Sequence, residues 1–163
     1  MDRIVIQPAK LADLPRIMEI YGTARAFMRS VGNPNQWKDN LPCENTLRCD
    51  IKAHNLFVMK ANDEIHAVFA FIVGDDPTYD LIEDGEWLSS VPYGILHRVA
   101  SDGDIHGVFE KAVKYASKRI RHLRVDTHRD NKIMQHLAEK NGFCRCGIIY
   151  VADGSPRIAY ERL

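Results

Sequence analysis

The chain has 163 residues, and its 22 Lys and Arg balance its 22 Asp and Glu, so the zero net charge disfavours a protein that holds nucleic acid by charge. Hydrophobic residues make up 45% and charged residues 27%, as in ordinary globular proteins, and the length predicts one domain over residues 1–163. No apolar run approaches the ~20 residues of a membrane-spanning helix, and residues 1–7 lack the apolar stretch of a secretory signal, so we expect a cytoplasmic protein that binds neither membrane nor nucleic acid.

Hydrophobic spacing predicts two helices and three strands in the first half of the chain. In chain order these are a strand over 3–7, helices over 13–29 and 44–54, and strands over 56–60 and 65–73. The short polar segment 61–64 joins the last two strands and predicts an antiparallel hairpin. Irregular segments with turn residues follow the first helix, at 32–37, and the hairpin, at 74–92.

The second half is predicted to contain two helices and four strands. They are a strand over 93–100, a turn over 101–104, a helix over 105–118, a strand over 123–126, a helix over 131–140, and strands over 143–151 and 157–162. Strand and helix alternate only in the centre of the chain, unlike in a doubly wound nucleotide-binding fold. The sequence therefore predicts an α+β domain with one mixed central sheet.

The four cysteines do not follow a metal-binding pattern. Cys144 and Cys146 lie two residues apart in a predicted strand, so their side chains would share one face. No second close pair and no nearby histidine completes a zinc set. We predict structural or incidental thiols and no metal, with metal or redox chemistry as the alternative.

Two polar segments are candidate binding sites. The strand, turn and helix over 95–116 would present the unpaired N–H groups of a helix start, which attract phosphates, and Gly107 would let a ligand approach the backbone. The alternative is a plain turn. The run 126–131 follows a strand and could face a cleft; alternatively it is a loop in which Asp130 or Asn131 caps the next helix.

Aromatic and titratable residues add weaker signals. Trp37 and Trp87 lie in the irregular segments and could wall a pocket for a small organic ligand, or each could cover a sheet edge. His97 is the first candidate for a general base, because imidazole titrates near neutral pH; a structural histidine is the alternative. Glu86 and Tyr150 are lesser candidates. The sequence has no Gly-x-Ser-x-Gly elbow, no phosphate loop ending in Gly-Lys-Ser/Thr and no His-Glu-x-x-His.

The order of the elements and two segments resemble the GCN5-related N-acetyltransferases, the GNAT superfamily. The segment 123–143, LRVDTHRDNKIMQHLAEKNGF, is similar to the family's strand, asparagine, helix and Gly-Phe ending, and residues 97–116 resemble its acetyl-CoA motif. The order of elements matches over essentially the whole chain. The resemblance implies a GNAT-like mixed, mostly antiparallel central sheet with a splayed parallel strand pair, flanked by helices.

The resemblance also implies direct transfer of an acetyl group from acetyl-CoA, as co-substrate, to a small amine or amino-acid-like acceptor. The pantetheine arm would lie between the splayed strands, near the backbone of Val99, Ala100 and Ser101, and would contact Asn131. The pyrophosphate would bind at the following helix start. The family's phosphate signature falls on 104–109, which adds these cofactor contacts: Ile105, His106, Gly107, Val108 and Phe109.

In this interpretation Trp37 and Trp87 flank the acceptor, and His97, or Glu86 through water, is the base. Tyr150 is the candidate general acid, because Ala138 replaces the tyrosine that the family often uses. The phosphate signature also departs from the family at positions 104 and 109, where Asp and Phe replace Gln or Arg and a small residue. These departures favour an alternative, a non-catalytic module with the GNAT fold that binds acyl-CoA or another small ligand. The expected partner is a small-molecule amine, and a homodimer is left open.

Overall fold

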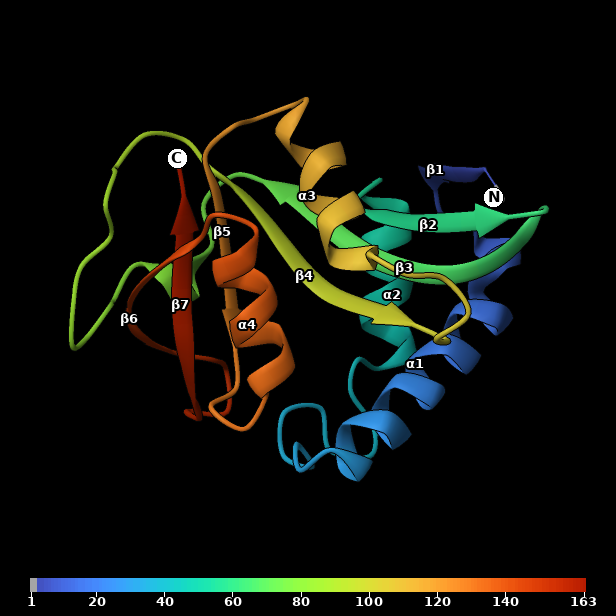
Figure 1. Ribbon diagram of the computed structural model, residues 1–163, viewed down its shortest axis with the longest axis horizontal. Coiled ribbons are helices and arrows are strands. Elements are labelled where there is room, and N and C mark those ends of the chain that lie inside the picture. Colours follow the sequence, from blue (N-terminus) through green and yellow to red (C-terminus); the bar gives the residue numbers. More distant parts are fainter. Residues whose placement is uncertain (1–2) are drawn as a thin grey trace.

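The computed structural model describes residues 3–163, so Met1 and Asp2 of the N-terminal segment lie outside the described residues. A seven-stranded sheet forms its centre, in the order β1-β2-β3-β4-β5-β7-β6 (Figure 1). The strands are β1 (Ile4–Pro8), β2 (Leu56–Ala61), β3 (Glu64–Val73), β4 (Gly94–Ser101), β5 (Leu123–Thr127), β6 (Cys144–Tyr150) and β7 (Pro156–Arg162). The helices are α1 (Leu14–Ser30), α2 (Glu44–Lys52), α3 (Val108–Ser117) and α4 (Lys132–Lys140).

The order of strands and α-helices is the predicted one, and the α+β class with a mixed sheet is confirmed. β4 and β5 are parallel, and the other neighbouring strands are antiparallel. Two short 3-10 helices, Leu11–Asp13 and Pro77–Tyr79, were not predicted. The third α-helix begins at Val108 rather than at 105, because Gly107 has a left-handed φ of 67° and turns the chain immediately before it. Among residues 3–163, no helix is long and apolar enough to cross a membrane.

Helices cover both faces of the sheet. α3 and α4 pack on one face, where their apolar side chains join the largest buried cluster (Figure 1). α1 and α2 cover the other face over β2, β3 and β4. The remaining part of that second face, over β4, β6 and β7, is covered by side chains of the segment 77–93 instead of a helix.

β4 and β5 pair at their first residues and then separate. The pairs are Gly94 with Leu123 and Ile95 with Arg124. Beyond them β4 runs away from β5 toward α1, as Figure 1 shows. The separation leaves main-chain groups on the inner edges of two strands that are free to meet a ligand.

A bulge in β4 marks the point of separation. The register with β3 shifts there, and Arg98 has a φ of 52°, a left-handed conformation that costs a non-glycine residue about 1–2 kcal/mol. Two contacts from the helical layer hold this residue. The Tyr21 hydroxyl of α1 donates to the Arg98 carbonyl at 2.7 Å, and Asp50 of α2 accepts from the Arg98 guanidinium at 2.7 and 2.9 Å. The strained bulge is therefore fixed by α1 and α2 together.

The thiols of Cys144 and Cys146 do not share one face of β6, so the expectation that they would is wrong. All four cysteines are free; Cys144 is exposed and Cys146 is buried. The pairing of β6 with β7 shifts between Arg145 and Gly147, and such a bulge breaks the regular alternation of side chains on a strand.

A buried carboxylate anchors the segment 77–93. Glu161 of β7 is 0% exposed and lies 2.6 Å from His122 Nε2 and 3.6 Å from Arg124 Nε. Its oxygens also accept the main-chain N–H groups of residues 88 and 89. The Arg124 guanidinium lies between the rings of Trp87 and Tyr93, 3.9 and 4.0 Å from their centroids. One charged group thus holds an irregular segment onto the sheet.

We expect Glu161→Gln to lower the free energy of unfolding by about 3 kcal/mol, because the change leaves the buried Arg124 guanidinium without its counter-charge. Urea unfolding followed by fluorescence measures the change, with the exposed Glu139→Gln as the matched control. Equal unfolding midpoints for the Glu161 variant and the wild type would show that the buried carboxylate does not anchor the segment.

Candidate active site

Two cavities meet where β4 and β5 separate. The larger cavity, of about 650 Å³, lies between the end of α1, the end of β4, the start of α3 and α4. The smaller cavity, of about 360 Å³, lies between β4, β5, the segment 36–46 and the β6–β7 turn. The two share five lining residues: Met28, Val99, Phe109, Asn131 and Met134. A molecule in one cavity would therefore reach the edge of the other.

The larger cavity brings together all the residues that the family resemblance assigns to acetyl-CoA. Its lining includes Val99, Ala100, Ser101, Ile105, His106, Gly107, Val108, Phe109 and Asn131. At its α3 end, the left-handed Gly107 precedes the first N–H groups of the helix, which have no partner inside the helix. At its α4 end, the Asn131 side chain accepts from the N–H of Met134 and so caps that helix. This wall is suited to an anionic group followed by an extended polar chain.

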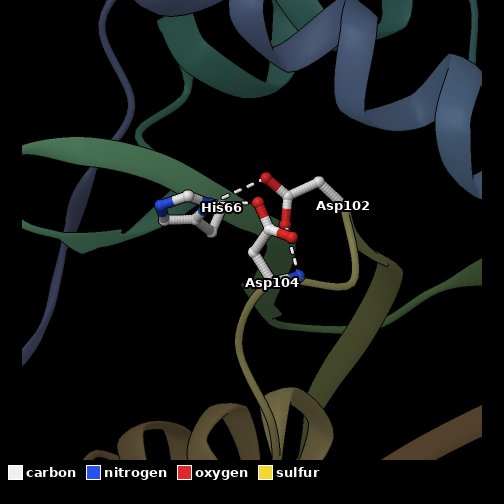
Figure 2. Close-up of side chains that lie close together, drawn as sticks. All are labelled: His66, Asp102 and Asp104. Carbon is white, nitrogen blue, oxygen red and sulfur yellow. Dashed lines mark hydrogen bonds and ion pairs between the residues drawn. The ribbon is translucent and has the colours of Figure 1, made fainter. Parts of the chain in front are cut away.

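The structure accommodates the two residues that depart from the phosphate signature in different ways. Phe109 is 4% exposed, and its ring packs 5.9 Å from that of Phe143 in the core. The Asp104 carboxylate lies 3.8 Å from His66 Nδ1, on the side of β3 (Figure 2). The Phe109 ring is therefore accommodated in the core, and the Asp104 carboxylate lies near the His66 ring.

His66, Asp102 and Asp104 form a compact cluster beside this turn (Figure 2), and one potential ligand atom from each lies within 4.8 Å of the others. Asp102 Oδ2 lies 2.7 Å from His66 Nδ1 and also accepts from Arg16 Nη2 at 2.6 Å. A metal ion bound there would lie beside the Arg16 guanidinium, which repels it. We interpret the cluster as an ion-pair network in which Arg16 offsets the negative charge of the turn that contains Asp102 and Asp104.

The smaller cavity contains a histidine flanked by two carboxylates. His97 Nε2 lies 3.5 Å from Asp76 Oδ2, and His97 Nδ1 lies 3.8 Å from Asp126 Oδ2. The Tyr79 hydroxyl donates to Asp126 Oδ2 at 2.6 Å and fixes that carboxylate. His97, Asp76 and Asp126 all line the cavity. Such a group can bind an ammonium ion and accept a proton from it.

The charge of Asp76 is stabilised at neutral pH. The hydrogen bond with His97, followed by those from Thr78, lowers the pKa of Asp76 to about 2. Burial, with a further contribution from the Asp126 charge, raises the pKa of Tyr79 well above its ordinary value, so its phenol keeps the proton that it donates. The Asp76 carboxylate beside His97 is thus available as an anion.

The opposite wall is built by the segment between α1 and α2. Gln36 Oε1 accepts from the side-chain amides of Asn33 and Asn131, both at 3.0 Å. Its main-chain carbonyl accepts from Arg157 of β7 at 3.2 Å. Trp37 lines the smaller cavity and meets the Tyr21 ring edge-on, with centroids 5.6 Å apart. Gln36 therefore joins this wall to β7 and to the start of α4.

Three sequence-assigned residues lie away from both cavities as the structure describes them. Trp87 donates its indole N–H to the Tyr79 carbonyl and stacks on Arg124, so it covers the sheet rather than an acceptor. Glu86 is exposed on the same segment. The Tyr150 hydroxyl donates to the exposed Glu83 at 2.8 Å, and this bond raises the pKa of Tyr150. We therefore give these three residues no role in the site, in correction of the earlier assignments.

Sequence reasoning missed three polar residues that line the smaller cavity. Asp76 belongs to an irregular segment, and no sequence pattern predicts the path of that segment over the sheet. Gln36 was noted only as the neighbour of Trp37. Arg157 had a usable signal: β7 pairs with β5 so that Ala159 is opposite Asp126, and alternation puts residue 157 on that same face. A correct strand pairing would have located it.

The structure resembles solved acetyltransferase structures over nearly its whole length. A GNAT-family acetyltransferase from Streptococcus agalactiae aligns with a TM-score of 0.85 and 28% identity, covering 98% of this chain and 95% of that chain. One from Listeria monocytogenes aligns with a TM-score of 0.71 and 17% identity, covering 98% and 94%. The ribosomal-protein-S18-alanine N-acetyltransferase from Escherichia coli aligns with a TM-score of 0.62 and 18% identity, covering 98% and 93%. No protein-family model and no curated protein matches the sequence.

These findings confirm the resemblance to the GNAT superfamily. The mixed seven-stranded sheet with one parallel pair, flanked by helices, is the fold of these neighbours. The similarity to the 28% identical GNAT-family acetyltransferase supports acetyl transfer as the general class of reaction.

The lowered pKa of Asp76 predicts a pH-dependent contribution to stability. An Asp with a lowered pKa stabilises the fold above its unfolded pKa, near 4, and this contribution is lost as the pH falls toward about 2. We expect the difference in unfolding free energy between the wild type and Asp76→Asn to shrink by about 1 kcal/mol over that range, a figure reduced because Asp76 is partly exposed.

Urea unfolding at several pH values between 5 and 2 measures this difference, and Asp39→Asn, whose side chain is 92% exposed, is the control. A difference that stays constant over the whole range would contradict the assigned interaction between Asp76 and His97.

Proposed function

We propose that the chain is an N-acetyltransferase that moves an acetyl group from acetyl-CoA to the amine of a small acceptor by direct transfer. The observation that carries the proposal is the junction of the two cavities. The larger has the lining expected for acetyl-CoA, and the smaller presents His97 between two carboxylates, at the point where β4 and β5 separate.

The residues of the larger cavity fit the pantetheine arm. Asn33 lines the cavity and is 2% exposed, and its side-chain oxygen has no hydrogen-bond partner among the described residues. A buried acceptor without a partner is costly, and the amide N–H groups of a pantetheine arm are donors of the required kind. Asn131 and the inner edge of β4 beyond the bulge would hold the same arm, and the α3 start would hold the pyrophosphate.

The bound thioester supplies the activated acetyl group. Main-chain N–H groups near Val99, on the β4 edge that has left β5, would polarise its carbonyl oxygen. The acceptor ammonium would bind between Asp76 and Asp126, and His97 would take its proton. A new C–N bond then forms and the C–S bond breaks. Overall, an ammonium and a thioester give an amide, a thiol and one proton.

One observation favours a second candidate function, binding of acyl-CoA without turnover. Ala138, at the position where the family often has a tyrosine, is 0% exposed and packs in the core. In this alternative the thiol-leaving step has no dedicated acid. Calorimetric titration with acetyl-CoA tests binding, and thiol release over a panel of amines tests turnover. Binding without thiol release would favour the second function, and no binding would overturn both.

Gly107→Val should weaken acetyl-CoA binding more than tenfold, or about 1.4 kcal/mol. Valine rarely adopts a φ of 67°, and its Cβ would lie 3.1 Å from Lys111 Nζ, so the turn before α3 must shift. Calorimetry gives the dissociation constant. Gly154→Val is the control, because Gly154 has a φ of 83° in the β6–β7 turn and does not line the larger cavity. The same loss of affinity in both variants would refute the placement of the pyrophosphate.

His97→Ala should slow acetylation about 10²-fold, within the usual range for loss of a general base, and leave acetyl-CoA affinity nearly unchanged. The variant should also lose the part of the wild-type pH dependence that arises from proton transfer to His97. Steady-state rates between pH 5.5 and 9 measure both effects, with the exposed His136→Ala as the control. A variant with the wild-type pH profile and rate would exclude His97 as the base.

A further inference from the structure

We propose that the acceptor carries a carboxylate as well as an amine, and that Arg157 binds the carboxylate in the smaller cavity. This inference rests on the proposed function and narrows the acceptor to the class of free amino acids and their short homologues.

Arg157 is a buried cation with donor capacity to spare. It lies on β7, is 7% exposed and lines the smaller cavity. Within the part of the chain that the structure describes, its guanidinium makes three hydrogen bonds, all to neutral oxygens: Ser155 Oγ at 3.1 Å, the Pro156 carbonyl at 2.9 Å and the Gln36 carbonyl at 3.2 Å. A guanidinium has five N–H donors, so two remain for a ligand.

The charge of Arg157 has no direct counter-ion. Within residues 3–163, no carboxylate lies within 4.0 Å of its guanidinium, whereas buried Arg124 and half-buried Arg98 are each paired with a carboxylate at that distance. Burial lowers the pKa of Arg157, and the charges of Asp126 and Asp153 only partly oppose this effect. Buried charges are normally paired, so a ligand oxyanion would supply the missing partner.

The position of Arg157 relative to the histidine site sets the geometry of the acceptor. Asp126 of β5 is opposite Ala159 of β7. Arg157 is therefore the diagonal neighbour of Asp126 on the same face of the sheet, and the Cα atoms of such neighbours lie roughly 7–8 Å apart. An ammonium held by Asp126 and Asp76 and a carboxylate held by Arg157 can therefore belong to one small molecule. The cavity volume of about 360 Å³ is at the lower end of the range for ligand sites.

The form of the anion follows from the available donors. Two free N–H groups of one guanidinium match the two oxygens of a carboxylate. Asp76 and Asp126 line the same cavity and would repel a more highly charged group such as a phosphate. A peptide N-terminus, in which the carboxylate is replaced by an amide, would leave Arg157 without a counter-ion.

Matched sets of acceptors test the proposal: free amino acids, their amides, and the amines that result from removing the carboxylate. Thiol release gives kcat and KM for each set with the wild type, Arg157→Gln and Arg157→Lys. We expect the wild type to prefer the free amino acids at least tenfold in kcat/KM. Arg157→Gln should raise KM for the amino acids at least tenfold and remove their advantage in kcat/KM over the amines.

Controls separate this role from a structural one. The exposed Arg145→Gln should change no parameter, and Arg157→Lys, which keeps the charge and lacks the planar fork, should lose only part of the preference. Thermal unfolding of each variant shows whether it is folded, and acetyl-CoA titration shows whether it binds acetyl-CoA. Equal wild-type activity on amino acids, amides and amines, or an equal loss on all three in Arg157→Gln, would overturn the proposal.

A binding measurement keeps the test valid if no acceptor is acetylated. Calorimetric titration of the acetyl-CoA-saturated protein with the same acceptors should show binding of free amino acids by the wild type and a loss of at least tenfold in Arg157→Gln. Absence of thiol release together with this pattern would reject acetyl transfer and keep the carboxylate site. Absence of any carboxylate-dependent binding would reject the carboxylate site itself.

Discussion

The separation of β4 from β5 is the constraint on which the rest of the site depends. Two parallel strands that stayed paired would fill the centre of the sheet with main-chain hydrogen bonds and leave no room between the layers. The left-handed Arg98 prevents this, and its conformation persists because Tyr21 and Asp50 hold both its carbonyl and its side chain. Both cavities, the exposed inner edge of β4 and the approach to α3 follow from one bulge secured by the helical layer behind it.

The smaller cavity has an acidic end and a basic end. Asp76 and Asp126 surround His97 at one end, and Arg157 lies one diagonal step away on the neighbouring strand. The larger cavity differs, because its lining combines the start of α3 and the buried amide of Asn33 with the charged side chains of Asp102, Glu110 and Lys140. This division suits a reaction between a long, flexible co-substrate and a small, charged one.

The sequence predicted what depends on local pattern. The order of strands and helices follows from hydrophobic spacing, and Asn131 was one of the two residues, with Asp130, that the sequence offered as a helix cap. The family resemblance, rather than local pattern, assigned residues 99–109 to one binding surface, and these residues are adjacent in the chain. Asp76 and Arg157 were missed because they reach the site through strand pairing and through a segment without regular structure. Trp87 was misplaced because its position is set by stacking on Arg124, a contact that spacing does not reveal.

Under the proposed function, the amide of Gln36 links the binding of the two proposed co-substrates. Its oxygen holds Asn131, which borders both cavities, and Asn33, which lines the larger one, while its neighbour Trp37 borders the smaller one. If the proposed reaction is correct, a molecule that displaces either asparagine would also remove a hydrogen bond from the segment that borders the smaller cavity. The affinities for the two proposed co-substrates would then be thermodynamically coupled, and each would alter the affinity for the other by the same factor.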